Sequence, residues 1–213
     1  MRDNPSSDVA FTEAVKAVQL RRKSRGIYAK VEAHGGFRTE ITADLVAFLA
    51  EIDTAYLATT NGAGQPYAQH RGGPKGFICQ VDKTTLGFAD YAGNRQYITT
   101  GNLAENDKAF LILMDYGQRR RIKLWGHARV VEDDAALAAH LMPVGYRAHV
   151  EQAILFRVDA WDVNCPQHIP QKLDAGDVAK AVGELRARIQ FLEAENGRLR
   201  TELARANPSV AQT

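Results

Sequence analysis

The sequence predicts an α+β protein in which a small antiparallel β-barrel of six or seven strands carries a few flanking helices. Three observations predict this fold class. Residues 54–129 consist of short β-type runs separated by Gly, Pro and Asn turns, the helices before residue 171 are few and short, and residues 178–203 follow a heptad pattern. A closed barrel is favoured over an open sheet because closure removes unpaired strand edges.

Composition narrows the class of protein. The chain has 213 residues, of which 45% are apolar and 24% charged, so it can bury a core. We expect three parts: an N-terminal helical segment (1–40), the barrel (41–170), and a C-terminal heptad-repeat helix and tail (171–213). The 27 Lys and Arg residues against 25 Asp and Glu leave a net charge of +2, which argues against a nucleic-acid partner.

The sequence gives no sign of export, membrane insertion or metal binding. The first 25 residues contain no apolar run of the signal-peptide kind, and no run of about 18 apolar residues occurs anywhere. We therefore expect a cytoplasmic protein with no membrane partner. Cys79 and Cys165 lie far apart without CxxC spacing, which argues against a zinc site or a redox pair and predicts no metal.

Two helices are expected before the strands. Residues 8–23 form a modest amphipathic pattern that ends in the basic cluster of residues 21–25, as suits a helix C-terminus. That cluster could instead contact nucleic acid, but its four charges fit a solvated helix end better. Thr42 can cap a second helix over residues 43–51, which has apolar residues on one face.

The strands follow from their β-type composition and turn residues. In chain order they are expected at residues 55–60, 66–71, 77–81, 85–89, 108–115, 119–132 and 153–164. Two short helices interrupt them, at residues 94–106 and 133–141. Gly126 lies in the middle of the longest strand and predicts a bulge or bend there.

The tail has a heptad repeat, because its apolar residues recur at alternating spacings of four and three. Position a holds Val182, Ile189, Asn196 and Leu203, and position d holds Val178, Leu185, Leu192 and Leu199. β-Branched residues at a, leucines at d and one asparagine at a favour a parallel two-stranded coiled coil. In such a coil Arg188 would face Glu193 of the partner helix, and Glu195 would face Arg200.

Other interpretations of the tail remain open. A single amphipathic helix lying on its own barrel would show the same spacing. Gly183 and Gly197 each weaken the helix by about 1 kcal/mol relative to alanine. A basic-region zipper is disfavoured because residues 171–180 hold too few positive charges to grip phosphates.

The first candidate site segment is residues 70–77. Arg71 brings a charge to the end of a strand, while Gly72 and Gly73 leave room for a flat ligand to approach the backbone. An ordinary turn is the alternative. On its own this segment does not indicate a site.

The second segment is residues 88–96, which run from a strand into a helix. Gly93 and Asn94 permit an unusual backbone, and Arg95 with the N–H groups of the helix start can form a phosphate cradle. In the alternative, Asn94 is an ordinary helix cap and Arg95 is solvated.

The third segment is residues 119–126. Strand alternation places Arg119, Arg121, Lys123 and Trp125 on one face. Three cations in a row repel one another unless an anion or a partner's carboxylates compensate them. An exposed edge strand kept soluble by charge is the alternative, although the large ring of Trp125 then needs cover.

His168 and Cys165 lie in the run NCPQHIP. A catalytic Cys–His pair needs an orienting third group and a lowered thiol pKa, and the sequence indicates neither. We therefore interpret His168 as a ligand contact and Cys165 as a packing residue.

Together these segments resemble the pyridoxamine 5'-phosphate oxidase-like family of FMN-binding split barrels. The resemblance covers residues 41–170 and depends on the order and spacing of its pieces. These pieces are ITADLVAFLAEIDTAYLATTNGAGQPYAQHRGGPKGF, TLGFADYAGNRQYITTGNLAENDKAFLILM, RIKLWGHARVVE and VDAWDVNCPQHIP.

The resemblance implies an FMN-dependent oxidoreductase that acts on a small molecule and forms a homodimer with FMN at the subunit interface. The matching residues are Arg71, Gly72 and Gly73 along the isoalloxazine ring, Asp90, Asn94, Arg95 and Gln96 at the ribityl phosphate, Arg121 and Lys123 on the strand from the second subunit, and the stretch from Trp161 to His168 that closes the site. No catalytic residue is predicted, because the flavin itself carries the redox chemistry.

The chain also departs from the family pattern. Gln96 stands where the family's oxidase has a second basic phosphate ligand, and the closing Trp and Arg-Leu pattern is replaced, which argues against pyridoxamine phosphate as substrate. One alternative is a non-catalytic flavin- or haem-binding sensor or carrier, with His70, His127 or His168 as haem ligand. Another is a deazaflavin in place of FMN.

Overall fold

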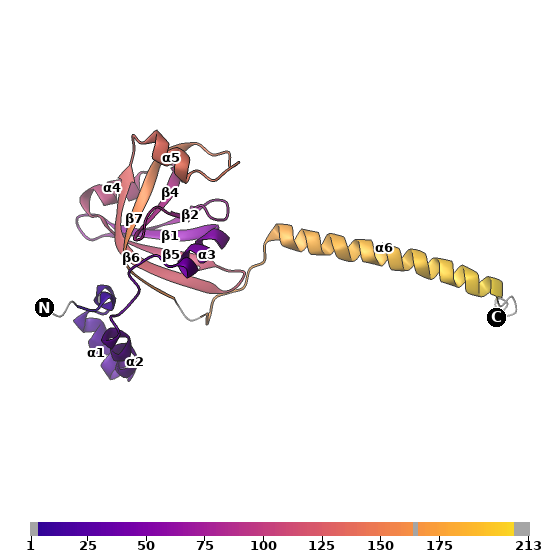
Figure 1. The fold of residues 1–213 in the computed structure, drawn as a ribbon, viewed down its shortest axis with the longest axis horizontal. Helices are drawn as coiled ribbons and strands as arrows, with labels where there is room; N and C mark the ends of the chain where they lie inside the picture. Colours follow the sequence, from indigo (N-terminus) through magenta and orange to yellow (C-terminus); the bar gives the residue numbers. More distant parts are fainter. Residues whose placement is uncertain (1–3, 164–165, 207–213) are drawn as a thin grey trace. The chain divides into compact units, whose positions relative to one another are not determined.

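The computed structural model describes residues 4–163 and 166–206 of the chain (Figure 1). Two compact units make up the chain, residues 1–170 and residues 171–213. Cys165, for which the sequence predicts a packing role, lies outside the described residues.

A seven-stranded sheet in which all neighbouring strands pair antiparallel forms the centre of the first unit. Its strands are β1 (Thr54–Thr60), β2 (Pro66–Gly72), β3 (Cys79–Gln80), β4 (Thr85–Tyr91), β5 (Lys108–Asp115), β6 (Arg120–Val131) and β7 (Val150–Val163). The strand order is β2-β1-β5-β6-β7-β4-β3, which leaves β2 and β3 as edges, so strand pairing does not close the barrel as the sequence analysis expects. The predicted α+β class is confirmed, with β3 shorter and β7 three residues longer at its start than the sequence indicates.

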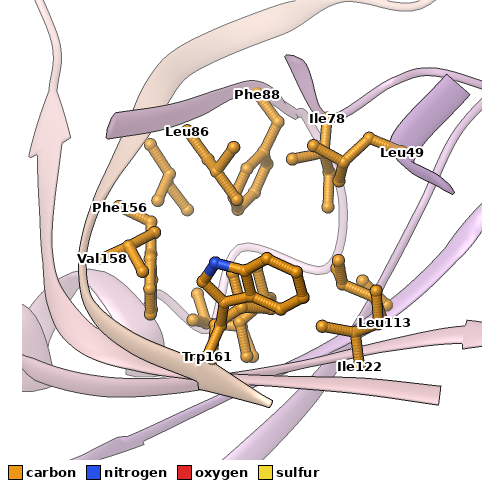
Figure 2. Packing of buried hydrophobic residues seen from close by; sticks show 14 of the residues in the cluster. Leu49, Ile78, Leu86, Phe88, Leu113, Ile122, Phe156, Val158 and Trp161 are labelled. Carbon is orange, nitrogen blue, oxygen red and sulfur yellow. The ribbon is translucent and has the colours of Figure 1, made fainter. Parts of the chain in front are cut away.

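The larger of two hydrophobic clusters contains residues of β1, β4, β5, β6 and β7, and a smaller one includes Leu141 and Leu155. Every second residue of β1 is buried, which is the alternation expected when one face of a strand meets the core. Helix α3 (Ala43–Glu51) begins at its predicted cap, where Thr42 Oγ1 accepts a hydrogen bond from Leu45 N at 3.4 Å. Figure 2 shows Leu49 of this helix and Trp161 of β7 within the same cluster.

The predicted bulge at Gly126 is present. The register of β6 against β7 shifts between Trp125 and Gly126, because Asp159 is an extra residue on β7. After this extra residue, the side chains of β7 that point toward the core belong to the other alternating set. Val158 and Trp161, three residues apart, therefore both reach the core (Figure 2).

The N-terminal segment contains two helices where the sequence predicts one over residues 8–23, so that prediction is wrong in extent. A short 3₁₀ helix, η1 (Ser6–Val9), precedes α1 (Glu13–Arg21) and α2 (Arg25–Ala33). The chain turns between α1 and α2 with Lys23 in the left-handed region at φ 63°. The sequence analysis did not predict α2, a helix that buries no residue.

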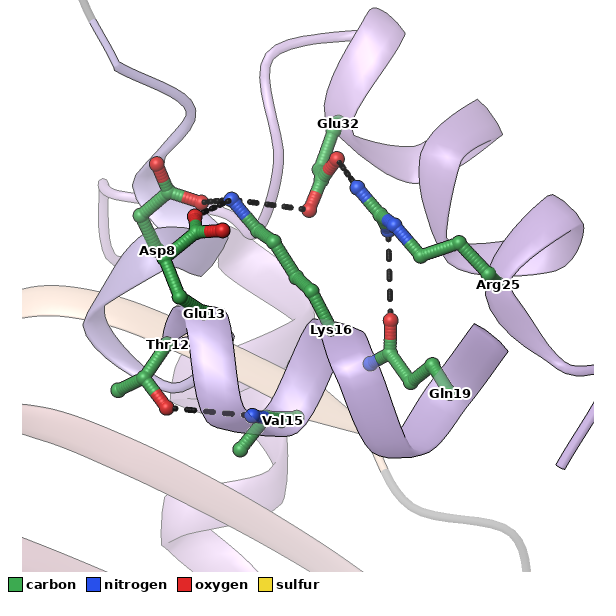
Figure 3. Close-up of polar contacts among 8 residues, drawn as sticks. All are labelled: Asp8, Thr12, Glu13, Val15, Lys16, Gln19, Arg25 and Glu32. Carbon is green, nitrogen blue, oxygen red and sulfur yellow. Dashed lines mark hydrogen bonds and ion pairs between the residues drawn. The ribbon is translucent and has the colours of Figure 1, made fainter. Parts of the chain in front are cut away.

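Ion pairs tie these helices together, as Figure 3 shows. Lys16 Nζ lies 2.8 Å from Asp8 Oδ1 and 3.8 Å from Glu32 Oε1. Arg25 pairs with the other oxygen of Glu32 and also donates to Gln19. One of the four cations in the basic cluster at residues 21–25 is therefore already neutralised within the fold.

Aromatic rings of the same chain cover Trp125. The Phe37 ring stacks on it with centroids 5.4 Å apart and an interplanar angle of 14°, and Phe110 lies 5.1 Å away on the neighbouring strand. Phe11 in turn contacts Phe37 at 5.2 Å. The cover that the sequence requires for this ring thus comes from the N-terminal segment and β5.

Two further helices belong to the first unit. Helix α5 (Ala135–Leu141) is capped by Asp134, whose Oδ1 accepts from Leu137 N at 2.8 Å. Helix α4 (Ile98–Glu105) begins four residues after the predicted start at Asn94, because residues 92–97 form a loop.

The second unit contains one long helix, α6 (Ala175–Ala206), which has 32 residues and buries none of them. Within residues 4–163 and 166–206, no helix has the length and apolar character needed to cross a membrane.

Candidate cofactor site

A hollow of about 180 Å³ opens beside the edge strand β2. Its walls come from β2, the end of β4, the loop of residues 92–97, the first turn of α4 and the start of β7. It contains five of the predicted site residues: Arg71, Asp90, Asn94, Arg95 and Gln96.

Arg71 and Asp90 form an ion pair that joins β2 to β4, strands from opposite ends of the sheet order. Both side chains are mostly buried, with exposed fractions of 11% and 13%. Gln152 Nε2 donates to the second carboxylate oxygen of Asp90 at 2.8 Å and to Thr100 Oγ1 at 3.0 Å. The pair is thus fixed by β7 and α4 as well.

Two buried polar atoms of residues that line the hollow lack a hydrogen-bond partner among the described residues: Arg71 Nε and Tyr91 Oη. Burial also raises the pKa of the Tyr91 hydroxyl, so it remains a neutral donor. A buried donor without an acceptor costs free energy comparable to a lost hydrogen bond. Two residues that line the hollow thus carry a donor for which the described residues supply no acceptor.

The loop of residues 92–97 has a strained backbone. Arg95 and Tyr97 adopt φ of 54° and 51°, in the left-handed region that non-glycine residues rarely occupy. Asn94 Oδ1 accepts from Gln96 N at 3.2 Å, so Asn94 stabilises this turn and does not cap α4 as the alternative interpretation held. Tyr97, the residue at the N-cap, provides no side-chain cap. The first N–H groups of α4 therefore lack a capping side chain at the hollow.

Each cation in the hollow has a carboxylate near it. Arg95 Nε lies 3.8 Å from Glu151 Oε1, a loose pair in which the arginine side chain is 71% exposed. Tyr97 Oη donates to the same oxygen at 3.0 Å, and this hydrogen bond raises the pKa of Tyr97. An anion that binds Arg95 must compete with Glu151, whereas Arg71 keeps a free Nε–H for it.

Sequence reasoning missed Glu151 and Gln152. The predicted strand begins at Ala153, and neighbouring strand residues ordinarily point to opposite faces. In the structure Asp90 pairs with Gln152 and Tyr91 with residue 150, so Glu151 is an extra residue in a bulge. This irregularity brings both neighbouring side chains to the hollow.

Gly72 and Gly73 adjoin Arg71 but do not line the hollow. A Cβ on Gly73 would lie 2.7 Å from Phe77 Cβ, and one on Gly72 would lie 2.8 Å from the His70 ring. Close packing therefore explains why both positions hold glycine. This explanation is separate from the approach of a ligand that the sequence analysis expects.

Arg121 and Lys123 do not line the hollow of their own chain. They lie on the face of β6 opposite its buried residues. Arg121 Nε has no hydrogen-bond partner among the described residues. Burial lowers the pKa of Lys123 and the charge of Arg121 lowers it further, against a raising effect of Asp162 at 3.8 Å. Of the predicted row of cations, Arg121 and Lys123 lie on one strand face, whereas Arg119 lies in the turn before β6 with φ of 53°. Lys123 Nζ also lies 5.1 Å from the centroid of the Trp125 ring.

The histidines proposed as ligands do not line the hollow either. His168 is exposed in a turn, with φ of 62°. His70 is exposed on β2. His127 has Nδ1 2.9 Å from Asp107 and Nε2 3.1 Å from Asp159, so both ring nitrogens already face carboxylates.

Metal and thiol chemistry find no support in the part of the chain that the structure describes. It contains no group of three or more His, Cys, Asp or Glu that could hold a metal ion. Cys79 Sγ donates to Gly87 O at 3.6 Å, and burial raises the pKa of this thiol, which keeps it protonated and unreactive.

Comparison with solved structures finds similar folds at low sequence identity. HupZ from Group A Streptococcus is 16% identical with a TM-score of 0.45, over 62% of this chain and 99% of that chain. A protein titled as a putative pyridoxamine 5'-phosphate oxidase from Lactobacillus delbrueckii is 18% identical with a TM-score of 0.45, over 59% and 95%. An FMN-binding protein from Syntrophomonas wolfei is 10% identical with a TM-score of 0.44, over 73% and 98%.

No curated protein matches the chain significantly. The family model described as pyridoxamine 5'-phosphate oxidase matches residues 41–165, which is more than half of the chain. This range contains every strand of the sheet and all the residues that line the hollow. The chain belongs to the pyridoxamine 5'-phosphate oxidase family.

Proposed function

We propose that this protein binds FMN and acts as an FMN-dependent oxidoreductase on a small molecule. The observation that carries the proposal is the hollow itself, whose lining combines Arg95 and the start of α4, which has no capping side chain, with Arg71, whose Nε–H is unpartnered. Such a combination binds phosphate, because N–H groups and a helix dipole both favour negative charge. The resemblance to the family supplies FMN as the phosphate-bearing ligand.

The residues present fit the phosphate end of FMN. Arg95, the backbone N–H groups at the start of α4 and the Tyr91 hydroxyl would hold the phosphate, while Arg71 would place positive charge beside the remainder of the cofactor. A hollow of about 180 Å³ is smaller than the 300–1,000 Å³ typical of small-molecule sites. One chain therefore encloses only part of the ligand.

A second copy of the chain would complete the site. In the proposed homodimer Arg121 and Lys123 of the second copy would face the cofactor, which explains why these cations lie on a sheet face of their own chain away from the hollow. Burial lowers the pKa of Lys123, which means that keeping this side chain charged costs the folded protein free energy. When bound, the flavin would supply two-electron transfer, and nearby cations would favour its reduced, more negative form.

The spectrum of the protein tests the proposal. The purified chain, as isolated or after incubation with FMN, is expected to retain one flavin per chain and to absorb at about 450 nm. Protein that stays colourless after incubation with FMN contradicts the proposal. Titration with a deazaflavin in parallel separates the two cofactors, and bound FMN without turnover of any electron donor indicates a carrier or sensor.

A pair of substitutions tests the phosphate position. Arg95→Ala is expected to raise the Kd for FMN about tenfold, because a charge-assisted hydrogen bond is lost. Glu151→Gln is expected to lower the Kd by about threefold, since it removes a competing, partly exposed carboxylate and keeps an acceptor for Tyr97. Flavin fluorescence titration measures both.

Arg22→Ala is the matched control, because it removes the same charge from an exposed position that does not line the hollow. Its Kd is expected to equal that of the unaltered protein. Equal affinities for the Arg95→Ala variant and this control would place the phosphate elsewhere.

A further inference from the structure

An unpartnered apolar stripe runs along α6. The helix has 32 residues and so spans about 48 Å. Its heptad positions are exposed within the second unit, with Leu185 64%, Ile189 54% and Leu203 63% exposed. Helices in water gain most of their stability from packing an apolar face, and this face packs on nothing in its own unit.

The stripe is shaped to receive a side chain. A hollow on α6 is lined by Ile189, Leu192, Glu193, Asn196, Gly197 and Arg200. The first four occupy heptad positions a, d, e and the next a. In a parallel coiled coil these four positions form the hole that accepts the d residue of the facing helix. At this level of an in-register pair that residue is Leu192 of the second copy.

We propose that α6 pairs with α6 of a second copy of this chain as a parallel, in-register two-stranded coiled coil. Asn196 fixes the direction and the register. In the parallel arrangement its amide meets the same amide of the second copy and both are hydrogen-bonded. In an antiparallel arrangement position a faces position d, so each amide would be buried against a leucine without a partner.

Charges beside the stripe are complementary in this arrangement. Arg188 at position g faces Glu193 at e of the second copy, and Glu195 at g faces Arg200 at e. Both contacts are attractive and occur twice in a symmetric dimer. The distribution of charge therefore favours the same partner as the apolar residues do.

The glycines of α6 also fit this arrangement. Gly183 and Gly197 both take position b, which points away from the facing helix. A Cβ added at either would meet nothing within 4 Å. They weaken the helix without breaking its apolar stripe. Arg198, at the outer position c, strengthens the helix surface by pairing with Glu195 at 3.4 Å and Glu202 at 2.9 Å.

Disulfide formation in the full-length chain tests the proposal. In a Cys79→Ser, Cys165→Ser background, Leu185→Cys and Leu203→Cys place one thiol near each end of the stripe, at positions d and a. Parallel in-register pairing brings identical positions together, so each variant is expected to form an interchain disulfide in a glutathione buffer. Thr201→Cys, at the outward position f, is the matched control and is expected to react at least about tenfold more slowly.

Two outcomes of this experiment would overturn the proposal. Equal rates for Thr201→Cys and Leu203→Cys would mean that two tails are merely tethered near each other, and would overturn the proposal. Absence of the disulfide in both leucine variants would overturn it in favour of an antiparallel pair, a different protein or the chain's own barrel. Because the experiment runs equally without FMN, its outcome is independent of the proposed flavin function.

Discussion

Replacing Arg71 with methionine is expected to lower the free energy of unfolding by about 3 kcal/mol and to remove measurable FMN binding. The stability loss arises because Asp90 would remain buried as a charge without its cation, with only the Gln152 amide left to compensate it. For a chain of this size the loss corresponds to a decrease in Tm of roughly 6–12 °C. Thermal unfolding followed by circular dichroism measures it.

A double substitution separates the two consequences of losing Arg71. Arg71→Met combined with Asp90→Leu removes both charges of the buried pair and is expected to recover most of the lost stability, because a buried ion pair replaced by apolar residues is often neutral. FMN binding is expected to stay lost in the double variant. Recovery of binding along with stability would mean that Arg71 only supports the fold, and the proposed role at the cofactor would be wrong.

Gly126→Ala is expected to lower the free energy of unfolding by about 3 kcal/mol or more, enough to reduce the yield of folded protein. A Cβ at this bulge would overlap the carbonyl oxygen of Arg157 on the paired strand and lie 3.0 Å from a ring carbon of Phe156. Overpacking a core typically costs 1–3 kcal/mol, and a clash with backbone cannot be relieved by a change of rotamer. Urea unfolding of the purified variant gives the measurement.

Gly101→Ala provides the comparison for Gly126. Gly101 lies in α4, and a Cβ there meets nothing within 4 Å. The substitution is expected to raise stability by up to about 1 kcal/mol, because alanine favours the helix. If Gly126→Ala unfolded at the same urea concentration as Gly101→Ala, the bulge would not require glycine.

The elements that the sequence predicts well are those with a local cause. Thr42 caps α3 because, at a helix start, a threonine hydroxyl can accept a hydrogen bond from the N–H three residues further on. Gly126 marks the bulge because a central strand rarely holds glycine without a close backbone neighbour. The predicted start of α4 was wrong because Arg95 and Tyr97 adopt left-handed φ values, and neither residue type predicts such a conformation.

The candidate site is less predictable because contacts between distant strands create it. Arg71 and Asp90 were each identified from the sequence, but their pairing depends on the strand order that places β2 and β4 on either side of the hollow. Glu151 was missed altogether. Its place at the hollow comes from a one-residue bulge, and a pattern of alternating residues cannot reveal a local break in its own register.

The two tryptophans of the chain lie in unlike surroundings, and this gives the protein two separate optical reporters. Trp161 is almost fully buried in the core, and its indole N–H donates to Glu40 O at 2.8 Å, so its emission responds to exposure of the core and to loss of this hydrogen bond. Trp125 is stacked on Phe37, so its emission follows release of the N-terminal segment. Intrinsic fluorescence of single-tryptophan variants can thus follow the release of Phe37 from Trp125 separately from the exposure of the core around Trp161.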